Sequence, residues 1–111
     1  MVDSFRHQGL RKQLVEHLAS KGITNLEVLN AMNKIPRHLF LDNAFINFAY
    51  QDKAFPIGAG QTISQPYTVA FQSQLLEIKP YEKVLEVGTG SGYQAAVLSL
   101  LDAEVFTIER Q

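Results

Sequence analysis

The sequence has no cysteine, no long apolar run and no excess of charge of one sign. The lack of cysteine excludes disulfides, thiolate nucleophiles and cysteine-ligated metals from this chain. The three histidines are scattered and match no metal-ligand spacing. No segment approaches the roughly 20 apolar residues of a membrane span, and the first residues lack a signal-like apolar stretch. With a formal net charge of -1, we expect a cytoplasmic protein that binds neither membrane nor nucleic acid.

The first half of the sequence has helical patterns. Leucine recurs every four positions within residues 5–21, which predicts an amphipathic helix. A second helix is expected to begin at Thr24, whose spacing to Glu27 is that of a capping box, and to end at Pro36. We interpret the next two residues, Arg37 and His38, as a helix-end arginine and a surface histidine; the alternative is that the arginine neutralises a substrate carboxylate.

The middle of the chain is less regular. A short helix is predicted at 43–48, followed by extended chain that runs into a flexible loop over 54–60. Ser64 is expected to be the N-cap of a helix that ends near residue 77, because Pro66 is tolerated in a first helical turn. The side chains expected to be buried in that helix are Val69, Ala70, Leu75 and Leu76.

From Lys83 onward the pattern is strand, glycine loop, helix, strand, at 84–87, 88–92, 93–101 and 104–109. This order is typical of the opening of a parallel α/β sheet. We therefore expect one partial domain, with a helical extension over 1–60 and the start of a cofactor-binding sheet over 61–111. Parallel sheets are normally covered on both faces, so the 111 residues are interpreted as part of a larger fold.

The glycine loop carries the main chemical signal. Its glycines let the backbone approach a ligand, and the helix that follows presents its positive end. Glu109 lies 21 residues after Gly88, close to the roughly 20 expected for a carboxylate that binds ribose hydroxyls. The alternative is a tight turn without a ligand and a solvated charge at a strand end.

Two residues around the loop bear on which adenosine cofactor would bind. The dinucleotide fingerprint requires glycine or alanine where this chain has Tyr93. Glu86 would repel a pyrophosphate, but it suits a ligand that carries a sulfonium and an ammonium group. The loop therefore favours S-adenosylmethionine over NAD, and the absence of Gly-Lys-Ser/Thr excludes a nucleotide-triphosphate loop.

Four stretches together resemble one enzyme family, the bacterial type of protein-L-isoaspartate O-methyltransferase. They read IPRHLF at 35–40, AYQDKAFPIG at 49–58, GQTISQPY at 60–67 and VLEVGTGSGYQ at 84–94. The resemblance implies a Rossmann-like methyltransferase fold, truncated after its second strand. It also implies methyl transfer from S-adenosylmethionine to the free α-carboxylate of isoaspartyl residues in damaged proteins, a repair reaction.

The resemblance further implies roles for individual residues. Ser64 would be the catalytic serine, and the cofactor would be bound by Thr62, Gln65, Glu86, Gly88, Thr89, Gly90, Gly92 and Glu109. The alternatives are a small-molecule methyltransferase of the same fold, an NAD-linked oxidoreductase, against which Tyr93 and Glu86 argue, and a non-catalytic fragment.

Overall fold

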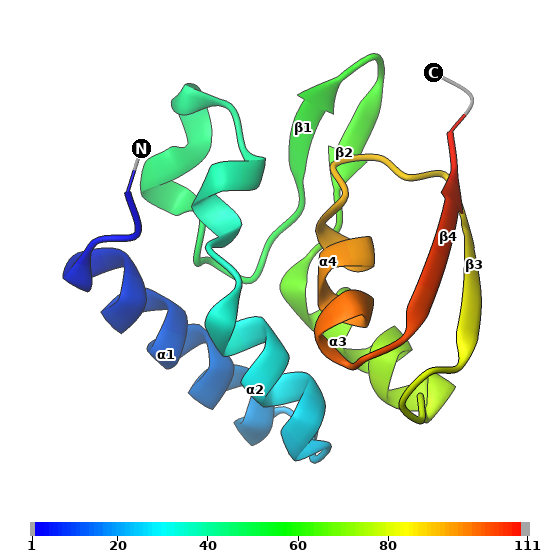
Figure 1. Ribbon diagram of the computed structural model, residues 1–111. Helices are drawn as coiled ribbons and strands as arrows, with labels where there is room; N and C mark the ends of the chain where they lie inside the picture. The colour runs from blue at the N-terminus through cyan, green and yellow to red at the C-terminus, as the bar shows by residue number, and fades with distance from the viewer. Residues whose placement is uncertain (1, 110–111) are drawn as a thin grey trace.

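A computed structural model describes residues 2–109, and Figure 1 shows how its elements are arranged. In chain order they are α1 (Phe5–Ser20), α2 (Leu26–Lys34), the 3-10 helices η1 (Arg37–Phe40) and η2 (Asn43–Phe48), β1 (Phe55–Gly58), β2 (Gln61–Ile63), α3 (Pro66–Leu76), β3 (Lys83–Val87), α4 (Tyr93–Leu100) and β4 (Glu104–Ile108). Across residues 2–109, none of the helices combines the length and the apolar character needed to cross a bilayer.

The first two helices begin at side-chain caps. Ser4 accepts the backbone N–H of His7 at the start of α1. At the start of α2, the cap is Asn25, whose side chain accepts two backbone N–H groups of the first turn. The prediction of Thr24 as this cap is wrong by one residue. The backbone N–H of Thr24 donates instead to the side chain of Gln74, 50 residues further along the chain. Asparagine is also at least as good a cap as threonine.

The segment predicted to end in a flexible loop is a tight antiparallel hairpin. Phe55 of β1 pairs with Ile63 of β2, and the two connecting residues, Ala59 and Gly60, both have positive φ. Such backbone angles match the twist of a two-residue hairpin turn. The prediction of extended chain is confirmed. The prediction of a flexible loop is wrong, because the two strands are joined by a tight two-residue turn. Residue 60, the expected boundary, lies inside this turn.

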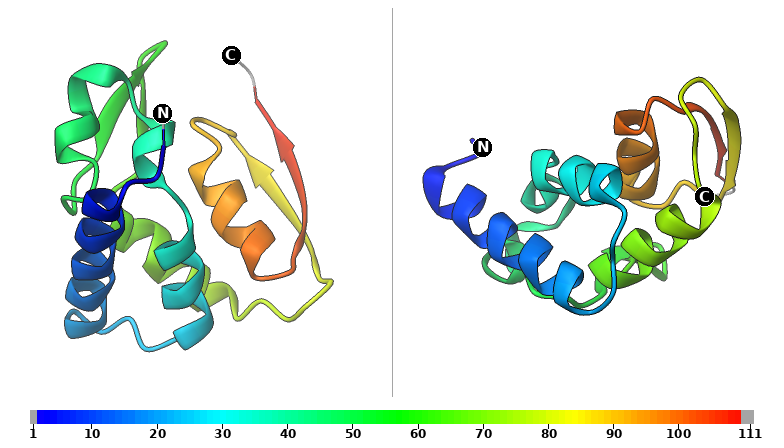
Figure 2. Two further views of the ribbon diagram at one scale, coloured as in Figure 1. Left: turned by 60° about the vertical axis from the view of Figure 1, so that its left-hand side comes forward. Right: turned by 90° about the horizontal axis from the view of Figure 1, so that it is seen from below.

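The second half of the chain contains the predicted strand–helix–strand unit. Strands β3 and β4 run parallel, in register from Lys83 opposite Glu104 to Val87 opposite Ile108. Helix α4, which connects them, lies between these strands and the helical layer (Figure 2). The glycine loop is thereby placed at the carboxyl end of β3, the usual edge for ligands in open α/β sheets.

One apolar core joins the helical layer, the hairpin and α4. Its most deeply buried members include Leu18, Ile23, Val28, Ile63, Val69, Ala70 and Val97. Leu75 and Leu76 were expected in this core, but they are 64% and 52% exposed. They line a groove of about 550 Å³ between α3 and β3 instead.

Candidate functional site

The glycine loop connects β3 to α4 in a backbone conformation that requires glycine. Gly88, Gly90 and Gly92 have φ angles of 87°, 55° and 84°, a region that other residues seldom adopt. A Cβ built at any of the three meets no atom within 4 Å. The glycines are therefore needed for the turn itself, and the space beside the loop is open to a ligand.

Glu109, just past the end of β4, is bound to this loop. One of its carboxylate oxygens accepts the backbone N–H of Gly90 at 2.6 Å, and the other accepts the side-chain amide of Gln61 at 3.4 Å. A carboxylate offers about four acceptor positions. The carboxylate can therefore hold the loop and still accept hydrogen bonds from vicinal hydroxyls of a ligand.

A second carboxylate, that of Glu86, lies on the neighbouring strand. It accepts the hydroxyl of Thr107 at 3.0 Å, and this hydroxyl lies 2.5 Å from that of Thr89 in the loop. The chain of three side chains fixes Glu86 beside the glycines. Two carboxylates at the carboxyl ends of adjacent strands make this edge of the sheet suited to a ligand with cationic or hydroxyl groups, and unfavourable for a pyrophosphate.

Ser64 and Thr62 lie on the same small cavity as the loop. The cavity has a volume of about 80 Å³ and is lined by Thr62, Ser64, Val69, Glu86, Gly88, Thr89, Gly90, Ser91, Tyr93 and Gln94. Glu109 lines an adjoining cavity that shares Gly88. The structure thus brings most of the expected site residues together. Two stand at helix starts instead: Gln65 is the N-cap of α3, and Gly92 that of α4.

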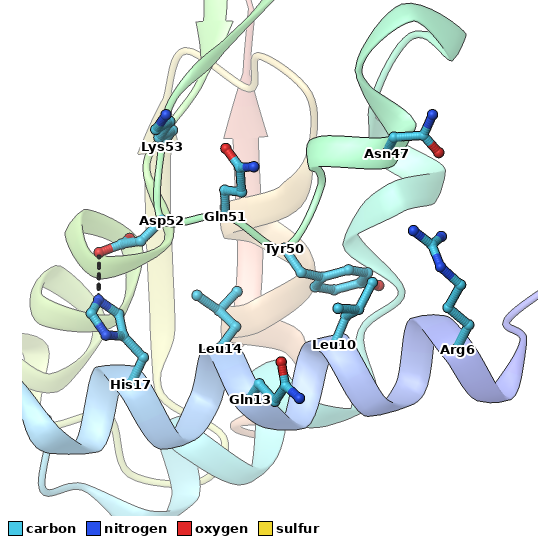
Figure 3. A pocket seen from close by; sticks show the side chains of 10 residues that line it. All are labelled: Arg6, Leu10, Gln13, Leu14, His17, Asn47, Tyr50, Gln51, Asp52 and Lys53. Atoms are coloured by element: carbon cyan, nitrogen blue, oxygen red, sulfur yellow. Dashed lines mark ion pairs between the residues drawn. The ribbon is translucent and has the colours of Figure 1, made fainter.

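The prediction that Ser64 caps α3 is wrong, because Gln65 occupies the N-cap position and a carboxylate from outside the helix accepts the first-turn N–H. One oxygen of Asp52 accepts the backbone N–H of Tyr67, in the first turn of α3, at 2.8 Å. Its other oxygen lies 3.3 Å from the ammonium of Lys21, the residue that follows α1. The same oxygen lies 3.7 Å from His17 on α1 (Figure 3). A negative charge is favourable at the N-terminus of a helix. The exposed Ser64 hydroxyl is consequently not needed as the cap.

Figure 3 also shows a larger groove, of about 560 Å³, between α1 and the segment around Asp52. Its lining comes from residues within 6–17 and 47–53. We assign the site to the smaller cavity, since the glycine loop and both carboxylates lie there. Volume alone does not identify a site.

Arg37 was interpreted as a helix-end arginine, but its side chain is fully buried. Its Nε donates to the carbonyl of Ala49 at 3.0 Å, and its Nη2 donates to those of Lys53 and Ser64 at 3.1 and 2.9 Å. Burial lowers the pKa of this guanidinium, which nevertheless stays charged, as arginine does in proteins. No local pattern signals this role, because the acceptors lie 12, 16 and 27 residues away in sequence.

His38 is also fully buried, so its prediction as a surface histidine is wrong. Its ring stacks on that of His7 at 3.8 Å, and its Nδ1 lies 2.8 Å from the hydroxyl of Tyr50. The same hydroxyl accepts from the buried Arg11, which also forms an ion pair with Asp3 at 2.8 Å. Three of these residues lie on or next to α1, whereas His38 lies on η1 and Tyr50 follows η2. The cluster therefore holds the N-terminal segment onto the helical layer.

Comparison with known proteins places this geometry in a family. The family model described as Protein-L-isoaspartate(D-aspartate) O-methyltransferase (PCMT) matches residues 9–111. A protein-L-isoaspartate O-methyltransferase of Flavobacterium johnsoniae is 70% identical over the whole chain, and one of Christiangramia forsetii is 69% identical. The chain spans 52% of the length of each of these relatives.

Solved structures agree with the sequence comparison. A protein-L-isoaspartate O-methyltransferase superposes with a TM-score of 0.79 at 28% identity, over 91% of this chain and 34% of its own. A Plasmodium falciparum protein, described as a putative protein-L-isoaspartate O-methyltransferase in complex with S-adenosyl-L-homocysteine, superposes with a TM-score of 0.73 at 27% identity. The superposition covers 91% of this chain and 49% of that protein's chain. The predicted α/β, Rossmann-like methyltransferase fold is confirmed, and the chain belongs to the protein-L-isoaspartate O-methyltransferase family.

Proposed function

We propose that the protein containing this chain methylates the free α-carboxylate of L-isoaspartyl residues in damaged proteins and peptides, in the cytoplasm. The observation that carries the proposal is the shared cavity of Ser64 and the glycine loop. It places a hydroxyl able to bind a carboxylate next to a loop able to bind a methyl donor. Family membership supports the same reaction and argues against a small-molecule methyltransferase.

The residues around the loop suit S-adenosylmethionine. Its methyl group, bound to a positively charged sulfur, would pass to a carboxylate oxygen as the C–S bond breaks and S-adenosylhomocysteine forms. Glu109 offers acceptors for ribose hydroxyls, and Glu86 offers a negative charge for the cationic part. Gly88 and Gly90 leave open space along the loop. One solved relative is described as a complex with S-adenosyl-L-homocysteine, which supports this assignment.

The chain's own contribution is positioning. A carboxylate is already ionised at neutral pH, because its pKa is about 3.5 to 4, so the reaction needs no strong base. Ser64 would hold one oxygen of the substrate carboxylate by its hydroxyl, and Thr62 would line the same wall of the cavity. Holding the nucleophile and the methyl group in line is the main requirement for such a transfer.

The test uses the full-length protein and two peptides that differ only in an isoaspartyl or a normal aspartyl linkage. With radiolabelled S-adenosylmethionine, we expect base-labile methyl ester on the isoaspartyl peptide and none on its aspartyl twin. Chromatography should then show the ester converting to succinimide and partly to the aspartyl peptide. Equal labelling of both peptides, or labelling of neither, would contradict the proposal.

A further inference from the structure

We propose that Arg37 is a positioning residue that sets the placement of Ser64 relative to the glycine loop. The inference rests on the proposed function, because Ser64 and the loop are taken as the substrate and cofactor sides of one site. Its physical basis is a single buried guanidinium that contacts both sides.

On the Ser64 side, Arg37 closes the base of the β1–β2 hairpin. Its Nη2 donates to the carbonyl of Lys53, shortly before β1, and to that of Ser64, directly after β2. One nitrogen thus joins the two ends of the hairpin. The backbone of Ser64 cannot shift away from the core without loss of a charge-assisted hydrogen bond, and such bonds are stronger than neutral ones.

On the cofactor side, the same guanidinium lies against Tyr93, the first residue of α4. Its central carbon is 4.8 Å from the centroid of the ring, an arrangement in which a cation is attracted to an aromatic face. Tyr93 is only 2% exposed, and Phe40 packs edge-on against it at 5.5 Å. Because Tyr93 directly follows Gly92, its position determines where the glycine loop enters the helix.

The energetics indicate a role beyond filling space. Within residues 2–109, Arg37 has no carboxylate partner at ion-pair distance, and its Nη1 makes no hydrogen bond. A buried charge without a carboxylate at ion-pair distance is costly, so a neutral side chain would serve packing at least as well. A guanidinium, however, is a rigid planar fork that can join three carbonyls and a ring, which lysine cannot reproduce.

Misplacement of a reacting group by about 1 Å can cost on the order of 100-fold in rate. In the full-length enzyme, we therefore expect Arg37→Lys to lower kcat by about 10- to 100-fold at saturating substrates. The dissociation constant of S-adenosylhomocysteine, measured by calorimetry, should change far less than kcat, because Phe40 still packs against Tyr93 and the loop and both carboxylates remain.

Arg11→Lys is the matched control. Arg11 is also buried, donates to the backbone carbonyl of Asn33 and lies over the ring of Tyr50, but it belongs to the N-terminal cluster. Both variants should lower the melting temperature, and only Arg37→Lys should lower kcat. Equal kcat losses in the two variants, or an unchanged kcat in Arg37→Lys, would overturn the proposal.

Hydrogen exchange gives a readout that does not depend on turnover. With S-adenosylhomocysteine bound, Arg37→Lys should speed exchange of the amides of residues 61–67, and Arg11→Lys should not. If the lysine variant does not fold, the same measurement is made on Arg37→Gln, which keeps a neutral hydrogen-bond donor. Wild-type protection at 61–67 in the variant that folds would refute positioning by Arg37. Lack of isoaspartyl methylation by the wild type would refute only the proposed function.

Discussion

Replacement of Ser64 by alanine tests whether its hydroxyl contacts substrate. The structure lets us predict the size of the change in the free energy of unfolding and in kcat/KM. Since Asp52 binds the first turn of α3 and the Ser64 side chain is exposed, the variant should keep its free energy of unfolding within about 0.5 kcal/mol. A hydrogen bond to a charged substrate group is worth about 1.5 to 3 kcal/mol. The expected loss in kcat/KM is therefore about 10- to 150-fold.

The assay measures melting temperature and methyl transfer to an isoaspartyl peptide for the full-length protein and its variants. Ser64→Asp should lose more activity than Ser64→Ala, because its carboxylate would repel the substrate carboxylate. Ser20→Ala, at the exposed end of α1, is the matched serine control and should retain full activity. Wild-type kcat/KM in Ser64→Asp would show that the hydroxyl does not face the substrate, and the site assignment would fall.

Three further perturbations follow. Glu109→Ala should weaken S-adenosylhomocysteine binding about 10- to 150-fold in calorimetry; an unchanged affinity would make Glu109 a structural loop anchor only. Asp52→Ala should cost about 1 kcal/mol of stability in denaturant titration through the lost cap on α3, and Asp52→Asn less. Burial, followed by the nearby His38 charge, lowers the pKa of His7 below its ordinary 6.5. As the pH falls, the unfolded state therefore takes up this proton at a higher pH than the folded state, and the free energy of unfolding decreases below about pH 6.5. His7→Phe should reduce the dependence of melting temperature on pH between about pH 7 and 5.

The second half of the fold could be predicted because its signals are local. Alternation of strand and helix patterns gave the β3–α4–β4 unit, and the glycines marked the loop between them. The spacing from Gly88 to Glu109 predicted a carboxylate that binds ribose hydroxyls, which stays a prediction; the structure shows that Glu109 binds the loop at Gly90. Each of these features depends on neighbours in sequence or on the strong geometric rules of a parallel crossover.

The errors at Ser64 and Arg37 share one physical cause, which is a partner distant in sequence. Ser64 was expected to cap α3, but Asp52 binds that helix from 15 residues before Tyr67. An arginine at this position is typical of a helix end, but hydrogen bonds to three carbonyls distant in sequence hold the Arg37 side chain in the core. A sequence pattern records which side chains are polar, and it does not record which backbone carbonyls the fold will bring to them.

The short bond between Gly90 and Glu109 makes one amide of the loop an internal probe. At 2.6 Å from a carboxylate oxygen, its proton should resonate well downfield of most backbone amides. Glycine signals also stand apart along the nitrogen axis of a correlation spectrum. A ligand whose hydroxyls compete for the carboxylate would lengthen this bond and move the signal upfield, whereas a ligand bound only along α1 would leave it in place. A single resonance can thus report whether a compound has reached the sheet edge, without any turnover.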